Sequence, residues 1–153
     1  MILLGIRCSP KEADYCVIDS SAETFEIIQL DKIVAPTFLS ESEQLRHIRN
    51  LLLDILRENK VESTVVRITE NNAHSPSVQR IRMEGVVIEA IASSEVKKYS
   101  TYVLNQIASK INVPKGDIKQ IVKNEIPFDY VPNFDSYKKL EREAILAALS
   151  ANY

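Results

Sequence analysis

The sequence predicts an α/β protein with a mixed five-stranded sheet, in which three antiparallel strands precede parallel crossovers and helices cover both faces. Three observations predict this fold class. The first third of the chain holds three apolar segments joined by short polar turns, a pattern typical of an antiparallel meander. A segment with apolar residues at helical spacing then leads to a fourth apolar run, which indicates a crossover to a parallel strand. The rest of the chain reads as helices with one further short strand.

The expected strands are short runs of apolar residues that end at polar turns. They cover residues 2–7, 14–20, 24–34, 63–68 and 97–99. The first shows little alternation between apolar and polar residues, as expected of a central strand that is covered on both faces. The fourth follows a helix, so we expect it to lie parallel to the first strand and beside it.

The expected helices cover residues 40–59, 77–93, 100–110, 114–123 and 135–150. Ser40 or Ser42 caps the first, Ser100 the third and Asp135 the last, because these side chains accept hydrogen bonds from free N–H groups at a helix start. The second is apolar on most faces after Gly85. We therefore expect it to be buried against the sheet on one side and against another subunit on the other.

Length and composition place limits on the class of protein. The chain has 153 residues and no visible linker or repeat, so we expect one domain over residues 1–153. The net charge is −2, whereas general nucleic-acid binders usually carry a basic excess, so binding of nucleic acid is not favoured. No apolar run is long enough to span a membrane, and the start of the chain does not read as a signal peptide. We expect a cytoplasmic protein in which Cys8 and Cys16 are free thiols, close together if the first two strands form a hairpin.

Several segments resemble a known family. These are residues 2–19 (ILLGIRCSPKEADYCVID), 55–67 (ILRENKVESTVVR), 83–87 with 97–100 (MEGVV, KKYS) and 140–150 (LEREAILAALS). On them the chain resembles the ribonuclease-H-like superfamily and is most similar to bacterial RuvC-type Holliday-junction resolvases. The similarity spans nearly the whole chain as a pattern of hydrophobicity and spacing. It implies the ribonuclease-H-like form of the mixed sheet described above.

The resemblance also implies where a catalytic site would lie. Such nucleases hold two divalent metals between carboxylates from the first strand, the fourth strand and the last helix. Those positions carry Arg7, Arg67 and, on the last helix, Leu140 and Glu143, with Glu141 in reach if the register shifts by one residue. At most one of four acids is retained and two positions are reversed in charge. We expect no metal cofactor and a loss of resolvase-type activity.

This substitution leads to a structural hypothesis. Arg7 and Arg67 would lie on adjacent strands near the same end of the sheet, where both guanidiniums need acceptors. Glu143 or Glu141 would supply a carboxylate between them. An ion-pair network would then replace the metal site and hold the last helix to the sheet. The mixed charges of that helix, including Arg142, are expected on its exposed side.

Other charged residues allow alternative interpretations. Paired arginines suit a phosphate or carboxylate, so Arg7 and Arg67 would form an anion site. Arg80 and Arg82, with Lys97 and Lys98, would form a basic surface for nucleic acid, although Arg80 and Glu84 are also spaced for an ordinary contact within a helix.

A relocated metal site is the second alternative. Glu70, just past Arg67, would act as a displaced acid together with Glu143 and either Asp129 or Asp135, and Mg²⁺ or Mn²⁺ would be the cofactor. His74 lies in the polar loop after the fourth strand and is a candidate catalytic histidine, but an exposed loop histidine is the simpler interpretation. His47 lies between arginines on a charged helix face and has no metal-ligand spacing.

The sequence therefore favours a non-catalytic, RuvC-like binding or assembly module. Its partner is expected to be a second copy, through the helix at residues 77–93, because the family that it resembles pairs; the protein partner is otherwise unassigned. The alternative is a metal-dependent nuclease that acts on structured nucleic acid with relocated carboxylates.

Overall fold

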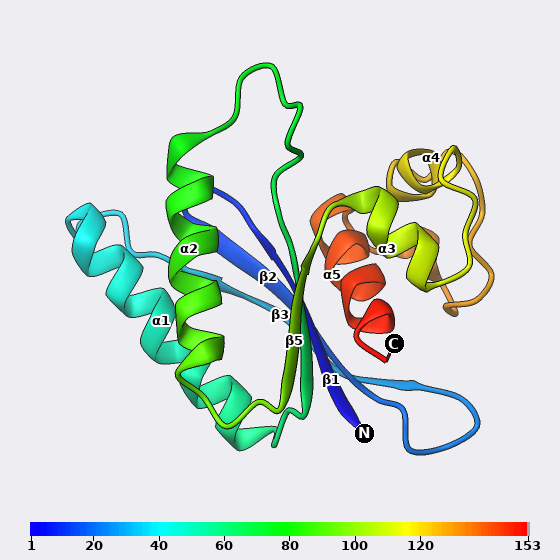
Figure 1. Ribbon diagram of the computed structural model, residues 1–153, viewed down its shortest axis with the longest axis horizontal. Coiled ribbons are helices and arrows are strands. Elements are labelled where there is room, and N and C mark those ends of the chain that lie inside the picture. Colours follow the sequence, from blue (N-terminus) through cyan, green and yellow to red (C-terminus); the bar gives the residue numbers. More distant parts are fainter. Residues whose placement is uncertain (153) are drawn as a thin grey trace.

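The computed structural model describes residues 1–152 and contains a mixed five-stranded sheet with the strand order β3-β2-β1-β4-β5 (Figure 1). The strands are β1 (Ile2–Cys8), β2 (Glu12–Asp19), β3 (Glu26–Val34), β4 (Ser63–Arg67) and β5 (Lys98–Tyr102). The pairs β1–β2 and β2–β3 are antiparallel, and the pairs β1–β4 and β4–β5 are parallel. The predicted fold class is confirmed, with the fourth strand beside the first.

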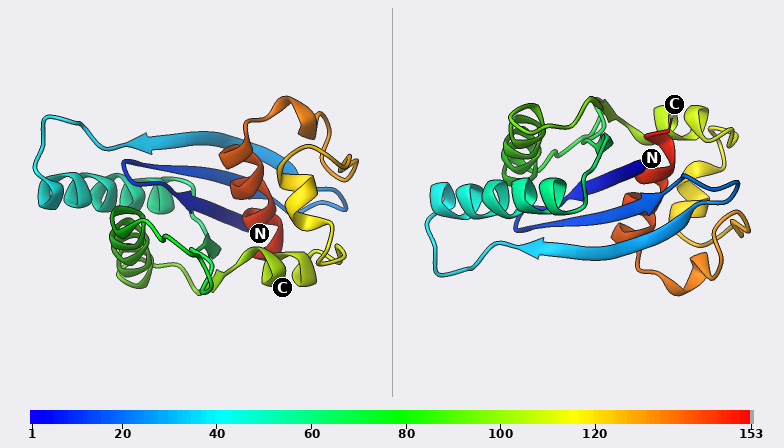
Figure 2. Two further views of the ribbon diagram at one scale, coloured as in Figure 1. Left: turned by 90° about the horizontal axis from the view of Figure 1, so that it is seen from above. Right: turned by 90° about the horizontal axis from the view of Figure 1, so that it is seen from below.

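Helices cover both faces of this sheet. They are α1 (Glu41–Glu58), α2 (Val78–Ala92), α3 (Leu104–Lys110), α4 (Ile118–Val122) and α5 (Lys139–Ser150), with a short 3₁₀ turn η1 (Phe134–Ser136) before α5. Two apolar clusters form the core. One lies between the sheet and the pair α1–α2, and the other lies between the sheet and α5, which α3 and α4 cover from outside (Figure 2). Strand β1 is buried between these layers, as its continuous apolar run predicts.

Local capping explains the start of α1. The side chain of Ser40 accepts a hydrogen bond from the backbone N–H of Glu43, and the carboxylate of Glu43 accepts one from the N–H of Ser40. This reciprocal capping box identifies Ser40, rather than Ser42, as the capping residue. The apolar stripe of the helix then turns Ile48, Leu52 and Leu56 into the core.

Two predicted helix starts are wrong. Ser100 lies within β5, which continues to Tyr102 because it pairs along the whole of β4, and α3 follows Val103 instead. Asp135 lies in the 3₁₀ turn η1, and the chain then runs extended through Tyr137 before α5. Helix α5 is therefore shorter than predicted and starts at Lys139.

Contact between β1 and α5 is exceptionally close at Gly5. A Cβ atom on this residue would lie 2.1 Å from the backbone nitrogen of Ala148 and 2.2 Å from the carbonyl oxygen of Ala144. The glycine and the alanine-rich face of α5 thus allow backbone to pack on backbone. Because Arg7 is two residues beyond Gly5, it lies on the same face of the strand and points toward the start of α5.

The remaining general expectations concern cysteines and membranes. Cys8 and Cys16 are free, as predicted, and both are buried, but they lie in the two different core clusters on opposite faces of the sheet. Burial raises the pKa of both thiols to about 12, so they stay protonated at neutral pH. Within residues 1–152, each helix is too short or too polar to cross a bilayer.

Candidate functional site: an arginine-glutamate cluster at the sheet edge

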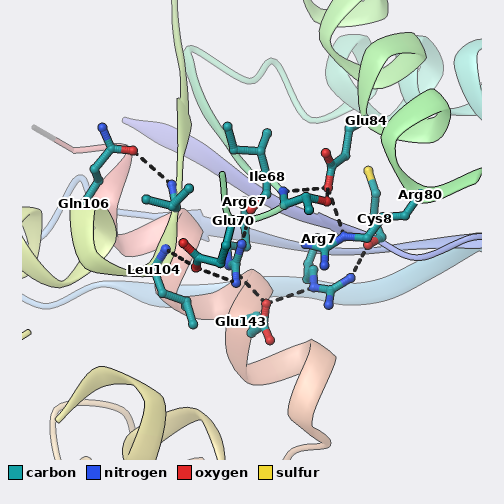
Figure 3. Close-up of polar contacts among 12 residues, drawn as sticks. Arg7, Cys8, Arg67, Ile68, Glu70, Arg80, Glu84, Leu104, Gln106 and Glu143 are labelled. Atoms are coloured by element: carbon teal, nitrogen blue, oxygen red, sulfur yellow. Dashed lines mark hydrogen bonds and ion pairs between the residues drawn. The ribbon is translucent and has the colours of Figure 1, made fainter. Parts of the chain in front are cut away.

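The parallel pairing of β1 and β4 brings two arginines together at one edge of the sheet. Arg7 and Arg67 are directly paired in the register of these strands, and Arg67 is the last residue of β4. Both side chains lie at the end of the sheet that faces the start of α5 (Figure 3). The predicted juxtaposition of Arg7 and Arg67 is therefore present.

Glu143 lies between the two guanidiniums. Its Oε2 atom accepts a hydrogen bond from Nε of Arg7 at 2.9 Å and lies 3.3 Å from Nε of Arg67. Each arginine also donates from Nη1 to a nearby backbone carbonyl, Arg7 to that of Cys8 and Arg67 to that of Ile68. Glu143 is 2% exposed, so one buried carboxylate joins β1, β4 and α5.

A second carboxylate, that of Glu70, forms an ion pair with Arg67 on the side away from Glu143. Its Oε1 atom lies 3.1 Å from Nη2 of Arg67 and accepts a hydrogen bond from the backbone N–H of Leu104 at 3.2 Å. Glu70 therefore connects the end of β4 with the start of α3. Glu70, the candidate displaced metal ligand, thus serves as an ion-pair partner of Arg67.

Helix α2 adds a third arginine and a third carboxylate. The Oε1 atom of Glu84 accepts hydrogen bonds from the backbone and the hydroxyl of Thr69, at 2.9 and 2.8 Å, and lies 2.9 Å from Nε of Arg80. Glu84 is 5% exposed. We call Arg7, Arg67, Arg80, Glu70, Glu84 and Glu143 the charge cluster. Its formal charges sum to zero, with three cations and three anions.

Burial and mutual repulsion lower the pKa values of two arginines in this cluster. Burial lowers the pKa of Arg67, and the charges of Glu143 and Glu70 oppose that shift. Burial also lowers the pKa of Arg80, and the neighbouring Arg7 lowers it further. Because a guanidinium has such a high ordinary pKa, Arg67 and Arg80 remain charged at neutral pH.

Asp14 is a neighbour of the charge cluster that sequence reasoning missed. It pairs directly with Arg7 in the antiparallel register of β1 and β2 and is 6% exposed. Burial and the charge of Glu12 raise the pKa of its carboxyl to about 6. Its presence inside an apolar strand is the signal in the sequence, but only the register shows that it lies opposite Arg7.

The other candidate residues lie elsewhere. Arg82 is exposed and pairs with Glu41 of α1, at 2.8 Å, rather than joining Arg80. Glu141 caps its own helix by accepting a hydrogen bond from the N–H of Lys138, and Leu140 is half-buried. Arg142, expected at the surface, is 7% exposed and donates from Nε to the carbonyl of Val122.

The residues of the alternative, relocated metal site do not lie together. Asp129 and Asp135 are exposed and line a surface depression with Glu125, to which neither Glu70 nor Glu143 contributes. His74 is exposed in the loop after β4, and His47 is half-buried on α1. Among the described residues 1–152, no three His, Cys, Asp or Glu side chains are grouped so that they would hold a metal ion.

The donor set at the edge of the sheet does not fit the divalent metals that the ribonuclease-H-like fold implies. Of the three carboxylates in the charge cluster, that of Glu143 lies between the ends of β1 and β4, and it is shared between two guanidiniums. Mg²⁺ and Mn²⁺ require several oxygen ligands, and an adjacent guanidinium repels them. Two guanidiniums of the chain itself neutralise this carboxylate and occupy its acceptor oxygen instead.

Comparison with solved structures defines the class of the fold as ribonuclease-H-like, in the form found in RuvC and other Holliday junction resolvases. RuvC from Thermus thermophilus matches with a TM-score of 0.73 and 14% identity, over 98% of this chain and 92% of that chain. The same RuvC in complex with a Holliday junction substrate matches with a TM-score of 0.68 and 14% identity, over 98% and 91% of the two chains. The yeast mitochondrial Holliday junction resolvase matches with a TM-score of 0.61 and 10% identity, over 96% and 77%.

These identities are low, so the similarity shows the fold. No protein-family model matches the sequence, and no curated protein is similar to it in sequence. The RuvC-like fold that the sequence predicts is confirmed.

Proposed function

We propose that this protein is a non-catalytic RuvC-like binding or assembly module, in which an ion-pair network stands where resolvases of this fold bind divalent metals. The observation that carries the proposal is the position of Glu143, whose Oε2 atom contacts Arg7 at 2.9 Å and Arg67 at 3.3 Å. The carboxylate that would hold a metal is thereby neutralised by two cations of the chain itself.

Electrostatics support a loss of metal-dependent catalysis. Two unit charges 4 Å apart interact by about 4 kcal/mol near a protein surface, so each guanidinium would repel a divalent cation at Glu143 by roughly 8 kcal/mol. At the same separation the carboxylate of Glu143 attracts this cation by about as much as one guanidinium repels it, so Arg7 and Arg67 together outweigh Glu143, and Glu70 on the other side of Arg67 offsets part of this repulsion. Hydrolysis that requires two such metals has no site at this edge of the sheet.

A nuclease assay tests the catalytic part of the proposal. The protein is incubated with a four-way DNA junction and with single-stranded DNA in 10 mM Mg²⁺ or Mn²⁺, beside a Glu143→Ala variant. We expect no cleavage by either protein and no metal-dependent rise in melting temperature. Cleavage by the wild type that is lost in the Glu143→Ala variant would show a working metal site and overturn the proposal.

The outer face of α2 supports the assembly part. Val78 and Ile81 are 56% and 45% exposed, although each is a large apolar side chain. Gly85 lies on the same face, and a Cβ atom added there would meet no heavy atom within 4 Å. A glycine inside a helix costs about 1 kcal/mol relative to alanine, so its presence on an open apolar face is suited to close approach by a second helix. A second copy of α2, related by a twofold axis, is the partner that we propose.

Sedimentation equilibrium tests this pairing. We expect the wild type to dimerise and an Ile81→Glu variant to be monomeric, because a charge would then face the twofold contact. Ile28→Glu is the matched control, since Ile28 is 49% exposed on the edge strand β3, away from α2. A wild type that stays monomeric at 100 μM, or equal dissociation of both variants, would contradict the proposed interface.

A further inference from the structure

We infer that Arg7 and Arg80, backed by Arg67, form a binding site for one phosphate-type oxyanion. The inference rests on the proposed function, because it assigns a ligand to the charge cluster that replaces the metal site. It is argued from three observations: adjacent like charges, donors without acceptors, and the depth at which each charge lies.

The first observation is the proximity of like charges. Arg7 reaches the edge of the sheet from β1 and Arg80 reaches it from α2, and their side chains lie beside each other (Figure 3). The repulsion between them is large enough that Arg7 is the leading charge that lowers the pKa of Arg80. Each has one carboxylate ion-pair partner, Glu143 for Arg7 and Glu84 for Arg80. An anion between the two guanidiniums would relieve this repulsion.

The second observation is a set of buried donors without acceptors. Among the residues that the structure describes, Nη2 of Arg80 is buried and makes no hydrogen bond, and the buried Nε atoms of Arg80 and Arg67 lie at ion-pair distance from a carboxylate without a hydrogen bond of normal geometry, that of Arg67 at 3.3 Å from Glu143. Nε of Arg80 lies near Glu84, but that oxygen already accepts two hydrogen bonds from Thr69. Arg67 is only 5% exposed, so water does not substitute freely there. Buried donors in native proteins are nearly always paired, which indicates that a ligand completes this set.

The third observation is the depth of the charges. The side chains of Arg7 and Arg80 are 13% and 15% exposed, whereas that of Glu143 is 3% exposed. Arg7 and Arg80 thus lie nearer to solvent than their own partners Glu143 and Glu84, whereas Glu70, the most exposed member of the cluster at 29%, contacts Arg67. An anion that approaches Arg7 and Arg80 from outside meets these two guanidiniums before it meets Glu143.

The geometry of the donors indicates the class of ligand. Several N–H groups from more than one guanidinium match the several oxygens of a tetrahedral phosphate, and arginine binds such groups through paired hydrogen bonds. A chloride ion offers one centre and leaves most of these donors unpaired. The same chemistry is shared by inorganic phosphate and by the terminal phosphate of a nucleic-acid strand.

Titration with inorganic phosphate tests the inference. Melting temperature and calorimetric affinity are measured from 0 to 20 mM sodium phosphate, with sodium chloride at matched ionic strength as the reference. We expect a saturable rise in melting temperature with phosphate alone. Affinity should fall at least tenfold in Arg80→Gln, and it should stay within twofold of wild type in Arg82→Gln, the exposed neighbour on α2 that pairs with Glu41.

Two results would overturn the inference: phosphate that stabilises no more than chloride, or equal affinity in the Arg80→Gln and Arg82→Gln variants. Arg80→Lys provides a second variant if Arg80→Gln does not fold. It keeps the charge but loses the planar fork, so its affinity should also fall, and wild-type affinity in this variant would count against the site.

A pair of trinucleotides identifies the source of the phosphate. Tighter binding of a 5′-phosphorylated trinucleotide than of inorganic phosphate indicates a strand end, and weaker binding indicates the free ion; both support the site. Equal binding of the 5′-hydroxyl trinucleotide contradicts it. Cleavage of the junction with Mn²⁺ would contradict the proposed function. It would not contradict the phosphate site, which the titrations with phosphate test independently.

Discussion

Helix α5 is attached to the sheet in two different ways along its length. Around Gly5 the contact is backbone on backbone, through Ala144 and Ala148, and contains no polar side chain. One turn toward the start of the helix, the contact is the carboxylate of Glu143 between Arg7 and Arg67. Close apolar packing fixes the position of a helix without further partners, whereas a buried ion pair contributes little net stability because its desolvation cost is large. The difference between these two contacts indicates that apolar packing fixes the position of α5 on the sheet. It also indicates that Arg7, Arg67 and Glu143 have a role other than stability.

The largest expected effect comes from filling the apolar contact. In a Gly5→Ala variant the new Cβ would overlap the backbone of Ala148, so α5 has to move away from β1. We expect a loss of about 4 kcal/mol or more in the free energy of unfolding, above the usual cost of overpacking. Urea denaturation followed by circular dichroism measures this loss. A change below 1 kcal/mol would show that the helix is not fixed by this contact.

Removing the central carboxylate tests the charged contact. A Glu143→Gln variant keeps the size of the side chain but leaves Arg7 and Arg67 without their shared anion, which we expect to cost about 3–5 kcal/mol in the free energy of unfolding. The matched control is Glu70→Gln, whose carboxylate is 29% exposed, and for which we expect a cost of about 1 kcal/mol or less.

A triple variant separates stability from function in the same contact. Replacing the three charges together, with Arg7→Met, Arg67→Met and Glu143→Leu, should be neutral or stabilising by about 1–4 kcal/mol, because none of these three charges is then left unpaired and Glu70, which loses Arg67, is 29% exposed. The same denaturation measurement applies. A triple variant as unstable as Glu143→Gln would mean that the ion pairs themselves hold the helix.

Asp14 gives a pH dependence of intermediate size. Its pKa is raised to about 6 in the folded protein from an ordinary value of 3.8, so the folded state binds the proton more tightly. This carboxyl therefore lowers stability as pH rises from about 4 to about 6 and has a constant effect above that range. We expect Asp14→Asn to be more stable than wild type by about 1–3 kcal/mol at pH 7, with the difference shrinking toward pH 4. Denaturation of both proteins across this range measures the difference, and a difference that grows toward pH 4 would contradict the assignment.

The smallest effect is expected on the outer face of α2. Gly85→Ala should stabilise the isolated chain by about 1 kcal/mol, because alanine favours a helix and the site is open. The same substitution should weaken dimerisation if two helices meet at this glycine. Unfolding at low concentration and sedimentation at high concentration measure the two effects, and tighter dimers would show that the helices do not approach each other there.

The sheet and the pairing of Arg7 with Arg67 could be predicted from the sequence, because apolar runs and the crossover rule define which strands are neighbours. The choice between Glu143 and Glu141 could not be made, since it depends on the start of α5. The buried side chain of Arg142, which donates to Val122 and to Tyr137, contributes to that start. Asp14 was missed because an antiparallel register is set by the turn between two strands, which the strand pattern alone leaves open.

Direct measurement of Mn²⁺ binding tests the central claim that the arginines exclude divalent cations from the edge of the sheet. Electron paramagnetic resonance of free Mn²⁺ is recorded while the wild type and a Glu143→Gln variant are titrated at low ionic strength. We expect no binding by either protein up to 1 mM Mn²⁺. Stoichiometric binding by the wild type that disappears in Glu143→Gln would contradict the claim.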